Sequence, residues 1–284
     1  MENAKAAYPT TGINRYVTRY LQSLHPAPGS SALDIPSGDG RASAVLHHLG
    51  MQVRALDLLP DKFHVDGVAC QYADLCQPLP LGDETVDLIV CQEGIEHMPN
   101  ALAVLEQFNR VLKPGGSLVL TTPNNSHVRA RLSRLFVGGS LMRYLPPSEV
   151  DSIWRPNPDG PIYFGHLFLL EVNQLWVLSR LAGFEVTQSR KTEVSPSSVA
   201  LGLILAPLIL AATLRAYRAS SQKFNPTRHP ALQALLWQQV KMNLSATALF
   251  CKHIFWVLTK RDSVERCRQQ LRPSIRKRAT SSPP

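Results

Sequence analysis

Acidic residues and glycines follow apolar runs at several points in the first 100 residues. Asp34 lies in the apolar run 32–35, and Gly38 and Gly40 form a short turn before a helical segment that starts at Arg41. Glycines let the backbone approach a ligand closely, and a helix N-terminus offers free N–H groups and partial positive charge. A strand, a tight turn and a helix in this order predict a site for a nucleotide or a nucleotide-like cofactor.

The charge at Asp34 distinguishes between cofactors. A dinucleotide fingerprint, G-x-G-x-x-G, would place a third glycine at position 43, where Ser43 stands. A carboxylate at this strand end would repel a pyrophosphate, whereas it suits a cofactor with a positive centre and a free amine. S-adenosylmethionine (SAM) has both features. The alternative is an ordinary strand–turn–helix connection without a ligand.

Two more carboxylates follow apolar runs. Asp57 ends the predicted strand 53–56, where a carboxylate can accept both hydroxyls of a ribose. Asp74 and Leu75 follow a weaker strand, 67–72, and could bind an adenine amino group and cover its ring. Asp74 can equally be a solvated loop residue or a helix cap.

A cluster of polar side chains follows the buried strand predicted at 86–91. Gln92, Glu93, Glu96 and His97 lie just beyond its end. In open α/β sheets, ligands sit outside the carboxyl ends of the strands, so this loop should border the reaction centre. Two carboxylates and an imidazole could handle a proton or hold Mg²⁺ or Mn²⁺. They could also cap the next helix and brace the loop.

The elements that must position these residues alternate between strand and helix. Helical spacing of apolar residues predicts helices at 13–24 and 101–112, the second ended by Lys-Pro-Gly-Gly at 113–116, and a strand follows at 117–122. This alternation is typical of an α/β protein whose parallel sheet is covered on both faces.

Taken in order, these motifs resemble the class I SAM-dependent methyltransferases over about residues 30–192. The matching segments are 33–40, Asp57, Asp74, 86–91, 112–116 and 165–186. Pro36 departs from the pattern, because the family more often has Gly there. The resemblance implies a Rossmann-like, seven-stranded, mostly parallel sheet with an antiparallel last strand and helices on both faces.

The resemblance also implies roles for single residues. The turn would line the methionine part of SAM with Asp34 near its amine, Asp57 would hold the ribose, and Gln92 and Glu93 would lie near the sulfonium. The implied cofactor contacts are Asp34, Pro36, Gly38, Gly40, Asp57, Asp74, Leu75 and Gln92. The candidates for proton handling are Glu93, His97 and His166.

The spacing E-x-x-E-H has two resemblances of its own. With His166 it resembles the metal-binding pattern of small-RNA 2′-O-methyltransferases, and alone it resembles ubiquinone-pathway O-methyltransferases. We assign no metal ligands here. Arginines at 129, 131, 134 and 143, with Phe136, Tyr144, Trp154 and Tyr163, could hold the anionic and ring parts of a substrate, or could form a solvated helix and a packed loop.

The composition places the chain in a reducing compartment with an anionic partner for its second half. Residues 1–150 hold 12 Lys and Arg against 14 Asp and Glu, whereas residues 151–284 hold 18 against 7. The five cysteines are odd in number and form no C-x-x-C. The first 11 residues lack an apolar signal core, so we expect a cytoplasmic protein.

An uncharged apolar stretch, 199–214, is followed at once by Arg215 and Arg218. If 251–261 is the antiparallel last strand, the insertion before it joins neighbouring strands and must leave and return on one side. We therefore predict a peripheral contact of 199–214 with the inner face of a membrane, with a packed helix or a dimer interface as the competing reading. The expected parts are 1–30 (helical), 31–192 (SAM-binding core), 193–250 (insertion), 251–261 (last strand) and 262–284 (basic, disordered tail).

These features together predict an enzyme that methylates an oxygen or nitrogen of a small molecule, glycan or lipid-linked intermediate, without a nucleic-acid partner. Two alternatives remain open. One is a non-catalytic SAM-binding or membrane-scaffold protein. The other is an RNA methyltransferase, which the basic tail and the E-x-x-E-H spacing favour.

Overall fold

The structure, a computed structural model, describes residues 11–139, 146, 148, 152–154, 162–223 and 230–270 of the 284-residue chain. Residues 1–10 and most of the tail predicted to be disordered lie outside these ranges. The chain separates into two compact units. Unit 1 draws on 1–122, 176–189 and 255–284, and unit 2 on 123–175 and 190–254.

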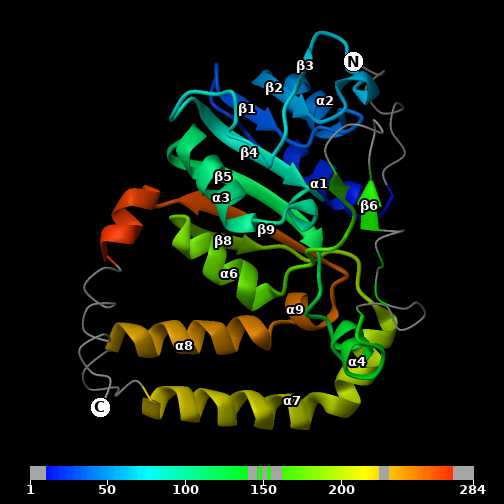
Figure 1. The fold of residues 1–284 in the computed structure, drawn as a ribbon, viewed down its shortest axis with the longest axis vertical. Helices are drawn as coiled ribbons and strands as arrows, with labels where there is room; N and C mark the ends of the chain where they lie inside the picture. The colour runs from blue at the N-terminus through cyan, green and yellow to red at the C-terminus, as the bar shows by residue number, and fades with distance from the viewer. Residues whose placement is uncertain are drawn as a thin grey trace. The chain divides into compact units, whose positions relative to one another are not determined.

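Unit 1 is built on a seven-stranded sheet in the order β3-β2-β1-β4-β5-β9-β8 (Figure 1). β1 pairs in parallel with both β2 and β4, and β8 pairs antiparallel with β9. This confirms the predicted mostly parallel sheet and its antiparallel last strand, inserted beside the fifth. The strands are β1 (Ser31–Asp34), β2 (Gln52–Asp57), β3 (Cys70–Tyr72), β4 (Val86–Gln92), β5 (Leu112–Pro123), β8 (Phe184–Ser189) and β9 (His253–Lys260).

Helices cover both faces of this sheet. α1 and α2 pack against one face through a core that includes Val17, Leu21 and Leu46 and the alternate strand residues Leu88 and Val90. α3 and α6 lie on the other face (Figure 1). The bounds are α1 (Gly12–Gln22), α2 (Arg41–His48), α3 (Ala101–Val111) and α6 (Val172–Leu181), with short 3₁₀ turns η1 (Pro60–Lys62) and η2 (Ile95–His97).

The Lys-Pro-Gly-Gly segment, residues 113–116, follows the end of α3 and forms a bulge near the start of β5. α3 ends at Val111, and β5 begins at once with Leu112 beside Val86. The next pair along β4 joins Leu88 to Ser117, so the intervening residues of β5 bulge out of the ladder. Gly115 has a φ of 76° within this bulge. The turn residues therefore interrupt a strand that the sequence predicted to begin only at 117.

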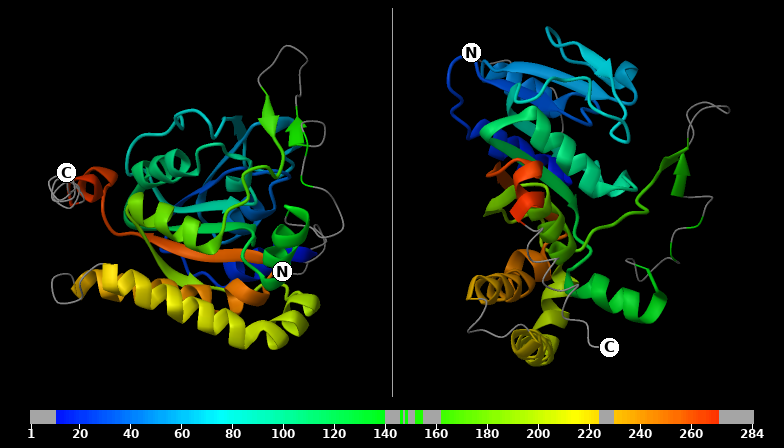
Figure 2. Two further views of the ribbon diagram at one scale, coloured as in Figure 1. Left: turned by 60° about the horizontal axis from the view of Figure 1, so that its bottom comes forward. Right: turned by 60° about the vertical axis from the view of Figure 1, so that its left-hand side comes forward.

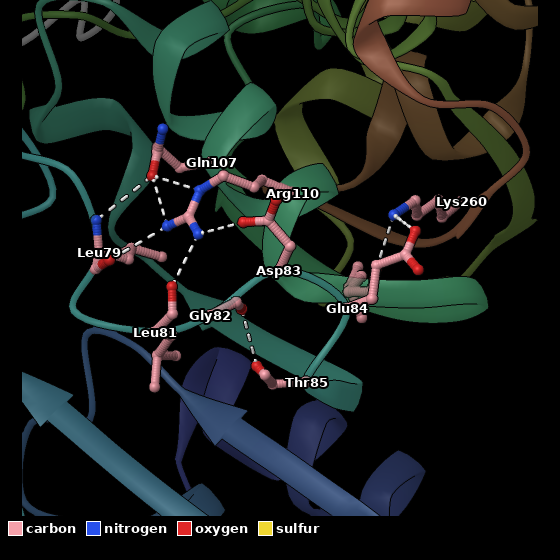
Figure 3. Close-up of polar contacts among 10 residues, drawn as sticks. Leu79, Leu81, Gly82, Asp83, Glu84, Thr85, Gln107, Arg110 and Lys260 are labelled. Atoms are coloured by element: carbon pink, nitrogen blue, oxygen red, sulfur yellow. Dashed lines mark hydrogen bonds and ion pairs between the residues drawn. The ribbon is translucent and has the colours of Figure 1, made fainter.

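Arg110, near the end of α3, fixes the loop that leads into β4 (Figure 3). Its guanidinium donates to the main-chain oxygens of Leu81 at 2.7 Å and Leu79 at 3.1 Å, and to the Asp83 carboxylate at 2.8 Å. Gln107 Oε1 accepts from the same group at 2.9 Å. Nearby, Lys260 Nζ donates to Leu112 O at 2.7 Å and so ties β9 to β5.

Unit 2 is mainly helical, and the buried side chain of Asn124 connects two of its segments. The Asn124 side-chain amide donates to three main-chain oxygens, of Thr247, Ala248 and Cys251, at 3.2, 3.0 and 2.8 Å. One buried side chain thus joins the end of β5 to the end of the insertion. The elements are α4 (Val128–Val137), β6 (Ile153–Trp154), β7 (Tyr163–Phe164), α7 (Pro196–Lys223), α8 (Pro230–Asn243) and α9 (Ala246–Phe250).

Arg110→Ala should lower the free energy of unfolding by about 1–3 kcal/mol, because two main-chain oxygens and a carboxylate lose their donor. Urea unfolding followed by circular dichroism measures this change. Arg19→Ala, at an exposed position of α1, is the matched control and should stay within about 0.5 kcal/mol of the wild type. Equal stability of the two variants would contradict the role given to Arg110.

Candidate functional site

The turn between β1 and α2 is held by main-chain bonds to both neighbouring strands. Ile35 N–H donates to Val90 O of β4 at 2.9 Å, and Ser37 N–H donates to Leu56 O of β2 at 3.0 Å. Gly38 and Gly40 have φ values of 55° and 93°, a region that favours glycine. The predicted glycine turn is therefore present at the carboxyl edge of the sheet.

Gly40 also has no room for a side chain. It caps α2, and a Cβ atom there would lie 2.3 Å from Val65 Cγ2 and 2.9 Å from Phe63 Cε2. The loop after η1 thus packs directly on the glycine. Both conformation and space require glycine at this position.

Asp34 is buried beneath this turn. Its Oδ2 accepts from Ser43 N–H at 2.9 Å and from Ser43 Oγ at 2.6 Å. Burial raises the pKa of Asp34 to about 7, against the lowering effect of the Ser43 bonds. Ser43 lies in the first turn of α2. The sequence showed only that this position lacks the third glycine of the dinucleotide fingerprint, whereas the structure makes Ser43 the hydrogen-bond partner of Asp34. The placement of Asp34 beside a cofactor amine stays a prediction.

Asp57 joins the end of β2 to the same turn. Its Oδ2 accepts from Gly38 N–H at 2.8 Å, and its Oδ1 accepts from Leu59 N–H at 2.8 Å. A carboxylate oxygen accepts two hydrogen bonds, so each oxygen keeps a lone pair for a further donor. This arrangement is compatible with the ribose contact, which stays a prediction.

Asp74 and Leu75 lie in the turn after β3. Asp74 Oδ1 accepts from Cys76 N–H at 2.8 Å, and Asp74 O accepts from Gln77 N–H at 2.9 Å. Asp74 therefore caps this turn, which is the alternative that the sequence left open beside an adenine contact. Both side chains are half-buried.

Pro36 and Gln92 connect the turn to the loop after β4. A Cβ atom at Gly94 would lie 2.5 Å from Pro36 Cδ, so this loop packs closely on the proline. Gln92 donates through its side-chain amide to Asn14 Oδ1 of α1. The first helix, the glycine turn and the end of β4 are thus linked at one edge.

Glu96, which is buried, and Glu93, which is half-buried, form an acidic pair in this loop. Glu93 has a φ of 50°, unusual for a residue with a side chain, and its N–H donates to Thr121 O at 3.1 Å. Thr122 Oγ1 donates to Glu96 Oε2 at 3.0 Å. Burial, and then the charge of Glu96, raise the pKa of Glu93 to about 8, and burial raises that of Glu96 to about 7. The pair can therefore hold or release a proton near neutrality.

The three predicted proton-handling residues belong to different parts of the chain. Glu93 and His97 lie in one loop of unit 1, with His97 at the end of η2. His166 lies in unit 2 and is exposed, just after β7. Their catalytic roles, and the absence of a metal at the E-x-x-E-H loop, stay predictions.

Two of the arginines that the sequence suggested for substrate binding, Arg131 and Arg134, form hydrogen bonds within unit 2. Arg131 donates to Ser126 O and, at 2.8 Å, to Asn243 Oδ1. Arg134 donates to the Glu171 carboxylate and to Asn125 O. These bonds give both side chains a bracing role, whereas Arg143 and Tyr144 lie outside the described residues.

A known family matches the part of the sequence that contains this turn and these strand ends. Residues 8–189 match a family model described as a methyltransferase domain. The ubiquinone biosynthesis O-methyltransferase of Xanthomonas campestris pv. campestris is 32% identical in an alignment 151 residues long that covers 49% of this chain and 61% of that protein. The corresponding enzyme of Xylella fastidiosa is 31% identical in an alignment 132 residues long that covers 42% of this chain and 52% of its own. The chain thus spans about three-fifths or less of these relatives' length.

Solved structures with a similar course of the chain are more distant in sequence. A SAM-dependent methyltransferase from Mesorhizobium loti has a TM-score of 0.48 and 13% identity, covering 86% of this chain and 96% of its own. A putative sarcosine dimethylglycine methyltransferase from Galdieria sulphuraria has a TM-score of 0.47 and 15% identity, covering 87% and 86%.

Gly40→Ala should lower the free energy of unfolding by more than about 2 kcal/mol, since backbone strain and a steric clash add together. Gly50→Ala is the matched control: Gly50 has a φ of 79° but nothing within 4 Å of the new Cβ. It should lose only the strain, about 1 kcal/mol. Urea unfolding compares the two, and equal losses would mean that the contact with Phe63 and Val65 is unimportant.

The raised carboxyl pKa values predict a stability that falls with pH. The folded chain holds protons on Asp34, Glu93 and Glu96 that the unfolded chain releases near pH 4, so the free energy of unfolding should decrease as pH rises from about 5 to 8. Glu93→Gln should make this decrease shallower, because the amide does not ionise.

Thermal unfolding at intervals from pH 5 to pH 9 measures the slope. Glu265→Gln, at an exposed position, controls for the loss of one carboxylate. A Glu93→Gln profile parallel to that of the wild type would contradict a raised pKa at Glu93.

Proposed function

We propose, from the premise that this chain belongs to the methyltransferase-domain family, that it transfers a methyl group from SAM to an oxygen of a small, lipid-linked molecule. The match over residues 8–189, which spans the glycine turn and the acidic strand ends, is the observation that carries the proposal. SAM is the methyl donor of this family. The oxygen acceptor is inferred from relatives named as ubiquinone biosynthesis O-methyltransferases.

The turn fits such a donor. Gly38 presents an exposed backbone without a side chain, and each Asp57 oxygen keeps a lone pair for a hydroxyl. In our proposal Asp57 holds the ribose, Asp74 and Leu75 the adenine, and Gln92 faces the sulfonium end. Bound SAM would supply an electrophilic methyl group.

The acceptor hydroxyl must also lose its proton, and the loop after β4 holds the candidate bases for this step. A base works best when its pKa lies near the operating pH, and Glu93 meets this condition through burial and the nearby charge of Glu96. We propose that Glu93 accepts the acceptor's hydroxyl proton, with His97 and His166 as the other candidates. Holding the oxygen in line with the S–CH₃ bond, away from water, supplies the rest of the rate.

A lipid-linked acceptor would bring this cytoplasmic enzyme to the inner face of the membrane. Glycans and soluble small molecules remain within the proposed acceptor range, because the chain matches only part of its relatives. A SAM-binding protein without turnover and an RNA methyltransferase are the competing functions, and the experiments below separate them.

Asp57→Ala should weaken SAM binding at least tenfold, because it removes the proposed ribose acceptor and the anchor of Gly38 N–H. Isothermal titration calorimetry measures the dissociation constant. Asp61→Ala, in the exposed turn η1, is the matched control and should bind SAM like the wild type. Unchanged affinity of Asp57→Ala would refute the ribose placement.

Turnover is tested by transfer of labelled methyl from SAM into lipid, glycan and RNA fractions of a bacterial extract. We expect label in the lipid fraction, at a rate that falls at least a hundredfold in Glu93→Gln with little change in SAM affinity. An excess of EDTA should leave the rate unchanged if the E-x-x-E-H loop holds no metal. Label confined to RNA, or SAM binding without any label, would refute the proposal.

A further inference from the structure

α7 exposes a continuous apolar surface. This helix runs over 28 residues, and the side chains of Leu203, Ile204 and Leu208 are 74, 75 and 67% exposed. Its most apolar 18-residue window has a mean hydropathy of 2.2, and 11% of that window is buried. A large exposed apolar surface of this kind marks an interaction site.

The exposed side of α7 changes from apolar to basic along one stripe. Ile204, Leu208, Ala211, Arg215 and Arg218 follow one another at alternating spacings of four and three, so they lie on one face of the helix. Residues 194–252 contain no Asp or Glu, whereas they contain six Lys and Arg. The surface therefore suits an apolar partner that also carries negative charge.

Three polar side chains of α7 contact other elements of unit 2. Ser198 Oγ lies 2.9 Å from His127 Nδ1, Thr213 Oγ1 accepts from Asn243 at 3.2 Å, and Ser221 Oγ donates to Gln233 at 2.6 Å. The last two contacts run along α8, which lies beside α7 (Figures 1 and 2). α7 thus has one face packed in the protein and the opposite face apolar and exposed.

The insertion begins and ends at the same place. Ser195 N–H donates to Phe250 O at 2.8 Å, and Val194 pairs with Cys251 in an isolated bridge. A single membrane crossing would separate these partners. A return crossing through α8 is also excluded, because its 14 residues reach about 21 Å, short of a hydrocarbon core of about 30 Å. α7 is therefore suited to lie along a membrane surface.

We propose that α7 binds in the plane of one leaflet of an anionic lipid bilayer. Leu203, Ile204 and Leu208 enter the acyl region, while Arg215 and Arg218 pair with lipid phosphates. α8 packs on the polar face of α7 and stays on the aqueous side, since its Gln238 and Lys241 are exposed. This binding requires no methyl transfer, so it can hold or fail independently of the proposed function.

Co-sedimentation of the full chain with vesicles tests this surface. We expect binding to vesicles of phosphatidylcholine and phosphatidylglycerol at 3:1, weaker binding to phosphatidylcholine alone, and a further loss with added salt. Ile204→Glu/Leu208→Glu should bind the mixed vesicles at least tenfold more weakly. Arg215→Ser/Arg218→Ser should bind about tenfold more weakly and with less dependence on salt.

Leu135→Glu is the matched control, because Leu135 of α4 is 73% exposed but lies outside α7. It should bind vesicles like the wild type, and an equal loss in this variant would overturn the assignment to α7. Thermal unfolding checks each variant's fold, and the arginine variant serves if the glutamate variant does not fold. A wild-type dimer that Ile204→Glu/Leu208→Glu converts to a monomer, without vesicle binding by either, would show that a second copy covers this face.

Discussion

The burial of carboxyl groups at one sheet edge constrains the rest of unit 1. Asp34 and Glu96 are 1% and 0% exposed, and a carboxylate taken out of water is costly unless donors surround it. The donors come from separate elements: Ser43 from α2 for Asp34, and Thr122 from β5 for Glu96. The turn, the helix and the neighbouring strand must therefore adopt this register for Asp34 and Glu96 to keep these donors.

The same burial gives the acidic residues different chemistry. Asp57 accepts hydrogen bonds from two main-chain N–H groups and so links the end of β2 to the glycine turn. Glu93 instead has a φ of 50° and a pKa raised to about 8. Unusual backbone conformations and raised carboxyl pKa values both cluster at functional sites, and here they meet in one residue. This combination is why Glu93, of these carboxyl groups, is our candidate base.

The sheet could be predicted from the sequence because apolar runs and the residues that end them are local signals. Contacts between distant residues could not. Ser43 bonds to a residue nine positions earlier, and Asn124 reaches main-chain oxygens more than 120 positions later. The bulge at Lys113–Gly116 looked like a helix stop, because its turn residues serve either purpose. The apolar run 199–214 also gave no sign of where the helix ends, since α7 begins at Pro196 and continues through its basic residues to Lys223.

The order of the strands has a consequence for synthesis of the chain. β9 lies between β5 and β8, although it follows them both in sequence. Among the strands that the structure describes, β8 pairs with β9 alone, so β8 cannot join the sheet until β9 has been synthesised. Until then the edge of β5 stays unpaired, and such edges attract other chains. The long apolar insertion is translated during this interval, before the sheet is complete.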